Sequence, residues 1–269
     1  MEIPGKYNVY IDTIKKYYKD RDMSHDYAHV EQVCKNALYI YHNEGTIVHS
    51  ETDELMLVIS ALGHDIWDHK YVTHDEINAL KIEFTKDIIS ILNNSRSNEV
   101  GVKRSWVSPF YGPIRSWISP RGPPRSWLRK VPNSPSDCDI LDSSIEIIDN
   151  ISFSKEYVIR RQGKTLMVDT DIVFLRNIVS DADKLESLGG MCLKRMISYA
   201  QHTNTMEGLF DHIKDHCQNK LYKLLDDNYI ITTVARNLAL PRLKELREIV
   251  DDDDALRDFI SYFSVALSV

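Results

Sequence analysis

Residues 55–68 read LMLVISALGHDIWD, a strongly apolar segment that ends in the pair His64-Asp65 and, shortly afterwards, Asp68. Leu55, Ile59 and Leu62 recur at the spacing of an amphipathic helix, so the segment is predicted to be helical. Ionisable side chains at the buried end of an apolar helix cost free energy unless they are paired or bind a metal ion. The stretch therefore predicts a helical fold with a polar or metal-binding centre at a helix end.

The helical period continues along most of the chain, with capping residues at 20–24 ahead of the first of these helices and Thr73 or Asp75 opening the third. A short hairpin is expected from 157–160 and 166–168, and residues 251–254 are expected to form a solvated loop. The predicted helices span 26–41, 55–62, 76–92, 140–151, 172–188, 191–199, 209–226 and 229–250.

Composition is that of an ordinary globular protein, with 43% apolar and 27% charged residues in a chain of 269. No stretch approaches the roughly 18 apolar residues of a membrane span, and the first residues lack the apolar core of a signal peptide. The four cysteines have no CxxC spacing, which favours free thiols in a reducing compartment. We therefore expect a cytoplasmic protein that does not associate with membranes.

Residues 95–136 differ from the rest of the chain. They contain seven of the nine prolines, three of the four tryptophans and a repeated Arg-Ser-Trp phrase. Such proline density forbids regular helix or sheet, so we expect a disordered basic insertion between residues 1–94 and 137–269 of one helical domain. The favoured interpretation gives this insertion no role in the chemistry. The alternative is a nucleic-acid-binding arm formed by residues 96–136, although the net charge of −7 argues against a nucleic-acid binder as a whole.

Two further clusters could join the first. His25 and His29 lie four residues apart, and Asp181, Asp183 and Lys184 follow the apolar segment 172–179. A buried histidine can equally bond to a backbone carbonyl, and an Asp-Lys pair can be a surface salt bridge. Because all three clusters lie at ends of apolar helices, a shared metal site is favoured over three separate structural explanations.

These clusters also carry a resemblance to a known family. The order His, His-Asp, Asp is similar to that of the HD-domain phosphohydrolase superfamily, and several stretches resemble its small bacterial members, some of which are nucleotide pyrophosphohydrolases. The resemblance implies an all-α fold consisting of a single HD-domain helical bundle. It covers nearly the whole chain except 95–136, and it weakens at 191–194, where a small apolar run is replaced. The matching stretches are 24–29, 63–71, 147–154, 180–189, 216–224 and 233–236.

The resemblance also implies roles for particular side chains. Two histidines with two carboxylates suit Mn²⁺, Fe²⁺, Ni²⁺, Co²⁺ or Zn²⁺ better than Mg²⁺. Carried over to this sequence, the metal ligands would be His29, His64, Asp65 and Asp183, the catalytic base Asp68, and the substrate-binding residues His25, Lys70 and Lys184.

The expected activity is metal-dependent hydrolysis of a phosphorylated small molecule. The resemblance favours nucleoside or deoxynucleoside triphosphates, cleaved to monophosphate and pyrophosphate. One alternative is a nucleotidase or phosphodiesterase acting on another phosphoester. An alternative of a different class is a non-enzymatic nucleotide sensor or nucleic-acid-binding module. The chain has no P-loop, GxGxxG or GxSxG element that would support another class of enzyme.

Overall fold

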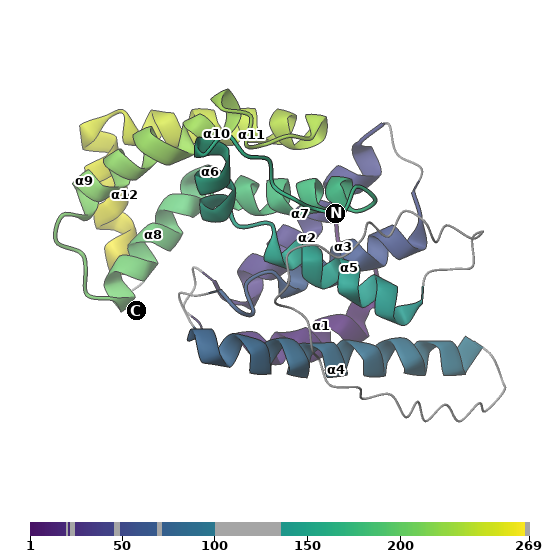
Figure 1. Cartoon of the computed structure of the whole chain (residues 1–269). Helices are drawn as coiled ribbons and strands as arrows, with labels where there is room; N and C mark the ends of the chain where they lie inside the picture. The colour runs from purple at the N-terminus through teal and green to yellow at the C-terminus, as the bar shows by residue number, and fades with distance from the viewer. Residues whose placement is uncertain (20, 22–24, 46–48, 69–71, 100–135, 267–269) are drawn as a thin grey trace.

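The computed structural model describes residues 1–19, 21, 25–45, 49–68, 72–99 and 136–266 (Figure 1). Every regular element in these ranges is helical, which confirms the all-α class. In chain order the helices are α1 (Asn8–Lys15), α2 (Tyr27–Asn43), α3 (Glu51–Gly63), α4 (His74–Glu99), α5 (Asp137–Asp149), α6 (Phe153–Arg161), α7 (Val173–Glu186), α8 (Gly190–His202), α9 (Leu209–His216), α10 (Lys223–Asp226), α11 (Thr233–Val250) and α12 (Asp253–Ala266).

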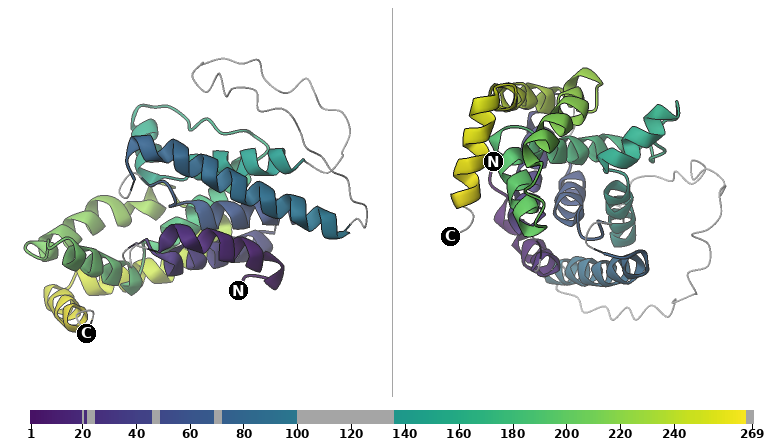
Figure 2. Two further views of the ribbon diagram at one scale, coloured as in Figure 1. Left: turned by 90° about the horizontal axis from the view of Figure 1, so that it is seen from below. Right: turned by 90° about the vertical axis from the view of Figure 1, so that its left-hand side faces the viewer.

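Helices α2, α3, α5 and α7 form the centre of the packing. Helix α2 lies against α3 and α7, α3 lies against α5, and α5 contacts both α4 and α7. Helix α11 extends this group because it contacts α7, α8 and α12 (Figures 1 and 2). Helices before residue 100 therefore contact helices after residue 135. In particular α3, which precedes His64-Asp65, contacts α7, which contains Asp183.

Short polar side chains fix where the central helices begin. The Asp26 carboxylate accepts a hydrogen bond from the His29 amide at 3.0 Å, so Asp26 itself caps α2. Ser50 caps α3 in the same way, and Ser136 forms a capping box with Asp139 at the start of α5. The prediction that residues 20–24 supply the cap of α2 was wrong, because the helix starts after a later Asx side chain.

The predicted hairpin was also wrong. Residues 157–160 lie inside α6, whose N-terminus is capped by Ser152, and residues 166–168 form no strand. A capped start and the buried Glu156 at the following turn hold this segment as helix, although its β-branched residues suggested a strand. Residues 251–254 are only partly a loop, because α12 begins at Asp253 and the Asp252 carboxylate accepts from the amides of the first turn.

Two predicted helices differ in their extent. The expected helix 209–226 contains a π-helical segment, Cys217–Leu221, between α9 and α10. Helix α4 runs to Glu99, beyond the end predicted at residue 92, and residues 100–135 of the Pro/Trp-rich segment lie outside the described residues. All four cysteines are free thiols. A membrane would need a longer or more apolar helix than any in the described part of the chain.

Candidate metal centre

The close packing of the end of α3 depends on Gly63. A Cβ at this position would lie 3.0 Å from Cδ1 of Ile148 and 3.1 Å from Cζ of Phe84. The absence of a side chain lets the backbone approach α5 and α4 directly. As a result, the chain turns immediately after Gly63 and carries His64 and Asp65 into the interior, where both side chains are nearly fully buried.

The turn that follows is held from two sides. The guanidinium of Arg21 donates to the carbonyl oxygens of Asp65 at 2.7 Å and of Ile66 at 2.6 Å. On the other side, the Trp67 indole donates to the Asp149 carboxylate at 3.0 Å. The charge-assisted hydrogen bonds of Arg21 to two successive carbonyls, together with the Trp67–Asp149 hydrogen bond, restrain the backbone of the turn.

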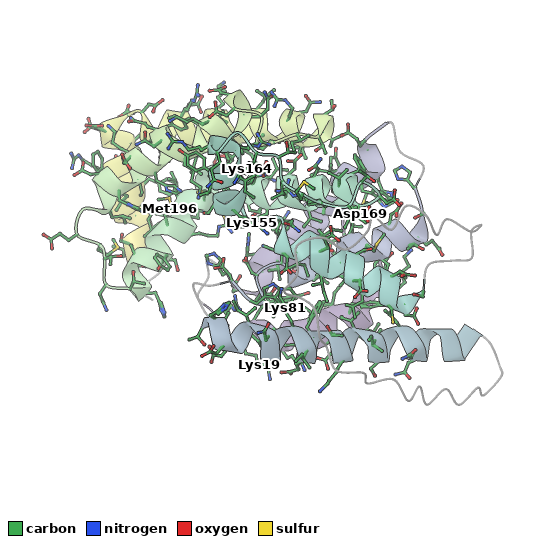
Figure 3. All side chains as sticks on the ribbon, in the orientation of Figure 1. Lys19, Lys81, Lys155, Lys164, Asp169 and Met196 are labelled. Carbon is green, nitrogen blue, oxygen red and sulfur yellow. The ribbon has the colours of Figure 1, made fainter. Side chains whose placement is uncertain are left out.

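The Asp149 carboxylate also ties α4 to this turn. Lys81 of α4, labelled in Figure 3, donates to both carboxylate oxygens of Asp149 at 2.6 Å. The same ammonium lies over the Trp67 ring, 5.2 Å from its centroid. The end of α5, the start of α4 and the His64-Asp65 turn are therefore joined through one carboxylate.

Helix α7 supplies one carboxylate to the centre and buries another. The Asp181 carboxylate accepts hydrogen bonds from the Ile231 and Thr232 amides and from the Thr232 hydroxyl, and so it anchors the start of α11. Asp183 instead points toward the histidines of α2 and α3. The structure thus places Asp183, and not Asp181, beside the other candidate ligands.

Four side chains meet at this centre. His29 Nε2 lies 3.6 Å from Oδ2 of Asp65 and 3.5 Å from Oδ1 of Asp183. His64 Nε2 lies 3.4 Å from the same Asp65 oxygen and 3.7 Å from the same Asp183 oxygen. Ligands about 2.1 Å from a cation lie about 3 to 3.5 Å apart, so these separations are close to those of a coordination shell. The atoms of His29, His64 and Asp183 all lie within 4.8 Å of one another.

The donor atoms themselves fit a cation. His64 Nε2 and Asp65 Oδ2 are buried and have no hydrogen-bond partner in the described part of the chain. An unpaired buried donor or acceptor costs about 1 to 3 kcal/mol, a cost that a bound cation would remove. The Asp183 side chain is 29% exposed whereas those of His29 and His64 are 4% and 2% exposed, so the centre opens to solvent on the Asp183 side.

Electrostatics favour ionised carboxylates at this centre. Burial alone would raise the pKa of Asp183, but the nearby His29 and His64 outweigh it and lower the pKa to about 2. The pKa of Asp65 is likewise held far below its usual range by the histidines despite its burial. Burial would lower the pKa of His64, but the Asp65 and Asp183 carboxylates raise it to about 9. A cation that binds His64 therefore competes with a proton for Nε2.

Two other predicted residues lie near the centre. The ring of His25 is 6.2 Å from that of His29, and His25 directly precedes Asp26, the N-cap of α2. Asp68 follows the turn and donates its amide to the Asp65 carbonyl at 3.1 Å. Lys70 lies outside the described residues.

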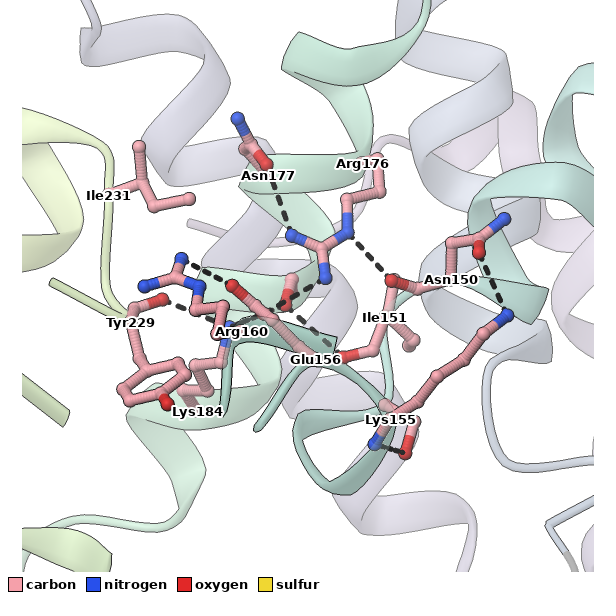
Figure 4. A network of polar contacts seen from close by, with 12 residues as sticks. Asn150, Ile151, Lys155, Glu156, Arg160, Arg176, Asn177, Lys184, Tyr229 and Ile231 are labelled. Atoms are coloured by element: carbon pink, nitrogen blue, oxygen red, sulfur yellow. Dashed lines mark hydrogen bonds and ion pairs between the residues drawn. The ribbon is translucent and has the colours of Figure 1, made fainter. Parts of the chain in front are cut away.

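Lys184 has a different position from the one predicted. Its ammonium donates to Glu156 at 3.1 Å, to the Ser180 hydroxyl at 2.7 Å and to the Tyr229 carbonyl at 3.0 Å (Figure 4). An ammonium has three donors, and all three are used by protein acceptors. The expectation that Lys184 binds phosphate is therefore corrected: it is a buried structural residue, and Arg176 completes the same network by donating to Glu156 at 3.0 Å.

Sequence reasoning missed three charged residues that bear on the centre. Arg21 holds the turn after α3, Glu156 neutralises the buried cations next to Asp183, and Arg195 of α8 donates to Nδ1 of His29. The burial of Glu156 is visible only in the structure, where a glutamate at a buried helical position needs cationic partners. No pattern in the sequence pointed to Arg195, which belongs to a different helix from every predicted ligand.

The comparisons with known proteins agree with this fold. No protein-family model matches the chain, and no curated protein does. Among solved structures, a Lactobacillus plantarum protein superposes with a TM-score of 0.54 at 18% identity, covering 95% of this chain and 98% of that one. Bacillus subtilis YpgQ, solved in complex with ADP, superposes with a TM-score of 0.51 at 18% identity, covering 90% of this chain and 94% of YpgQ.

Identities at this level show a shared fold. The chain is thus an all-α protein with the architecture of these small bacterial proteins over nearly their whole length. Within that fold, α2, α3 and α7 bring two histidines and two aspartates together as a candidate metal centre.

Proposed function

We propose that this chain is a divalent-cation-dependent phosphohydrolase of the HD type that acts on nucleotides. The observation that carries the proposal is a pair of buried atoms, His64 Nε2 and Asp65 Oδ2, which have no hydrogen-bond partner among the described residues and lie 3.4 Å apart beside His29 and Asp183. A protein interior does not leave such atoms unpaired without compensation. A cation held by these four side chains supplies that compensation.

The proposed ligands are His29, His64, Asp65 and Asp183, and a mixed imidazole-carboxylate set suits Mn²⁺, Fe²⁺, Co²⁺, Ni²⁺ or Zn²⁺. The Nδ1 atom of His64 donates to the Ala61 carbonyl at 2.8 Å, which fixes the ring with Nε2 toward the centre. When bound, a divalent cation supplies Lewis-acid polarisation of a phosphoryl oxygen and acidifies water.

The chain's own residues supply the remaining chemistry. Asp68 lies one turn after the ligand pair and is proposed to accept a proton from the attacking water. His25, beside His29, is proposed to contact the substrate on the same side. Lys70 remains a proposed phosphate contact. Since the centre opens beside Asp183, the substrate is expected to approach from that side.

A nucleotide is the favoured substrate class because the similarly folded YpgQ was solved with ADP. Within that class we favour nucleoside or deoxynucleoside triphosphates, hydrolysed to monophosphate and pyrophosphate. This choice follows the resemblance of the sequence motifs to the nucleotide pyrophosphohydrolases among the small HD hydrolases.

The test is product analysis on the full chain loaded with Mn²⁺ and supplied with a panel of nucleotides. We expect phosphorus NMR to show pyrophosphate and a nucleoside monophosphate, with activity and bound Mn²⁺ both lost in Asp65→Ala. Asp142→Ala, which removes an exposed carboxylate of α5, is the matched control and is expected to retain both. Orthophosphate as the sole product would instead indicate a nucleotidase, and full activity in Asp65→Ala would refute the metal centre.

A further inference from the structure

Arg195 is a basic side chain in direct contact with a proposed metal ligand. From α8 its Nη1 donates to Nδ1 of His29, and its Nη2 donates to the backbone carbonyl of Glu186 at the end of α7. Nε2 of His29 therefore faces the candidate metal centre, whereas Nδ1 contacts the guanidinium of Arg195. None of the chemistry described above uses this arginine.

Among the residues that the structure describes, two other basic side chains near the centre are committed to protein acceptors. Arg21 uses both terminal nitrogens on the carbonyls of Asp65 and Ile66, and Lys184 has all three donors occupied. Arg195 is only partly buried, and its two protein contacts use two of the five N–H groups of a guanidinium. It thus combines accessibility, spare donors and a position beside the ligand cluster.

The contact between Arg195 and His29 is incompatible with cation binding at the opposite ring nitrogen. An arginine can only donate, so Nδ1 of His29 must accept in this contact. A neutral histidine that binds a cation through Nε2 carries its proton on Nδ1, where it would meet the N–H of Arg195. Cation binding at His29 therefore removes the acceptor that holds Nη1 of Arg195.

The second contact of Arg195 keeps the guanidinium at the centre when the first is lost. The end of α7 is fixed because the Glu186 carboxylate accepts from Asn36 at 2.8 Å and from Arg242 at 2.9 Å. The Glu186 carbonyl that accepts from Arg195 is thus part of a rigid segment. Arg195 can pivot about this contact and turn its remaining donors toward a ligand next to the cation.

We propose that Arg195 is a phosphate-binding residue of this centre. Its guanidinium is held by His29 until a cation binds, and it then donates hydrogen bonds to the phosphate of the substrate. The inference rests on the proposed function and extends it by naming the residue that receives the phosphate. A guanidinium matches a phosphate through two parallel N–H···O bonds, which a point charge cannot reproduce.

The test compares Arg195→Met, which keeps much of the side-chain length but has no donor, with Lys194→Met as a matched control. Lys194 is the adjacent residue, and its ammonium lies over the Phe263 ring, 4.4 Å from the centroid, on the α12 side of α8. Calorimetry would measure binding of Mn²⁺ to each full chain, and then binding of the Mn²⁺ complex of adenosine 5′-(α,β-methylene)triphosphate.

Arg195→Met is expected to bind Mn²⁺ at least as tightly as the wild type, because His29 no longer gives up a hydrogen bond. Its affinity for the nucleotide analogue is expected to fall at least tenfold, whereas Lys194→Met remains unchanged. If Arg195→Met does not fold, Arg195→Lys replaces it in the test. This variant is expected to bind the analogue several-fold more weakly than the wild type and to retain the wild-type affinity for Mn²⁺.

Two results would overturn the inference. One is unchanged affinity for the analogue in Arg195→Met, and the other is a loss of Mn²⁺ affinity in that variant, which would make Arg195 a positioning residue for His29. These differ from failure of the proposed function, in which the wild-type chain itself binds no Mn²⁺ or hydrolyses no nucleotide.

Discussion

Nδ1 of His64 lies 2.8 Å from the carbonyl oxygen of Ala61, one turn earlier in α3. This carbonyl is one of the last in the helix, where no backbone amide of the helix is available to pair with it. One hydrogen bond thus satisfies the helix end and sets the direction of the imidazole, so that Nε2 faces Asp65 and Asp183. The local structure of α3 and the geometry of the proposed centre are therefore coupled.

Metal binding is expected to stabilise the folded chain. A cation that binds only the folded state at 100 times its Kd adds about 2.7 kcal/mol to the free energy of unfolding. We expect Mn²⁺ to raise the midpoint of thermal unfolding of the wild type and a chelator to reverse the effect. In His64→Gln the shift should largely disappear, and an equal shift in both proteins would show that the cation binds elsewhere.

Glu156 is expected to be a stability residue. Its carboxylate lies 3.0 Å from Arg176 and 3.1 Å from Lys184, and the side chains in these pairs are 3% exposed. Removal of one partner of a buried ion pair leaves an uncompensated charge, so Glu156→Gln should lower the free energy of unfolding by about 3 to 5 kcal/mol in urea titrations. Glu248→Gln, whose i,i+4 partner Lys244 is largely exposed, is the control and should change it by less than about 0.5 kcal/mol.

The ion pairs of Glu156 with Lys184 and Arg176 also predict how the free energy of unfolding depends on pH. Burial would raise the pKa of Glu156, but Lys184 and Arg176 outweigh it and hold the pKa below its usual value. A carboxyl group with a lowered pKa stabilises the fold above the ordinary glutamate pKa of about 4.3, and this contribution is lost as the pH falls through the folded value. The stability difference between wild type and Glu156→Gln should therefore be constant near neutral pH and shrink below about pH 4. A difference that grows on acidification would contradict this assignment.

The sequence predicted the elements that rely on local patterns. The apolar period of 55–62 and the polar residues after it were enough to indicate α3 and the His64-Asp65 pair at its end. Lys184 could not be placed in this way, because its partner Glu156 comes from α6 and only packing brings the two together. Arg195 was missed for the same reason, since its contact with His29 joins α8 to α2.

Arg21 is expected to maintain the geometry of the centre without contributing a ligand. Its two hydrogen bonds to the Asp65 and Ile66 carbonyls require a planar fork, which lysine lacks. Loss of a group that orients a metal ligand typically costs about 10- to 100-fold in metal affinity. Calorimetry with Mn²⁺ should therefore show weaker binding in Arg21→Lys while circular dichroism shows the wild-type helix content. Wild-type affinity in this variant would mean that Trp67 and Asp149 alone fix the turn.

A side chain at Gly63 is expected to be tolerated only if the neighbouring Ile148 is replaced by a smaller residue. A Cβ here would lie 3.0 Å from Cδ1 of Ile148 and 3.1 Å from the Phe84 ring, so Gly63→Ala should push α3 away from α5 and destabilise the fold by about 1 to 3 kcal/mol. Ile148→Val removes the nearer atom and alone should cost about 0.5 to 1.5 kcal/mol. In the double variant the two losses should be less than additive in urea unfolding, because the clash that causes the first is relieved by the second. Strict additivity would show that the ring of Phe84, and not Ile148, limits the approach of α3.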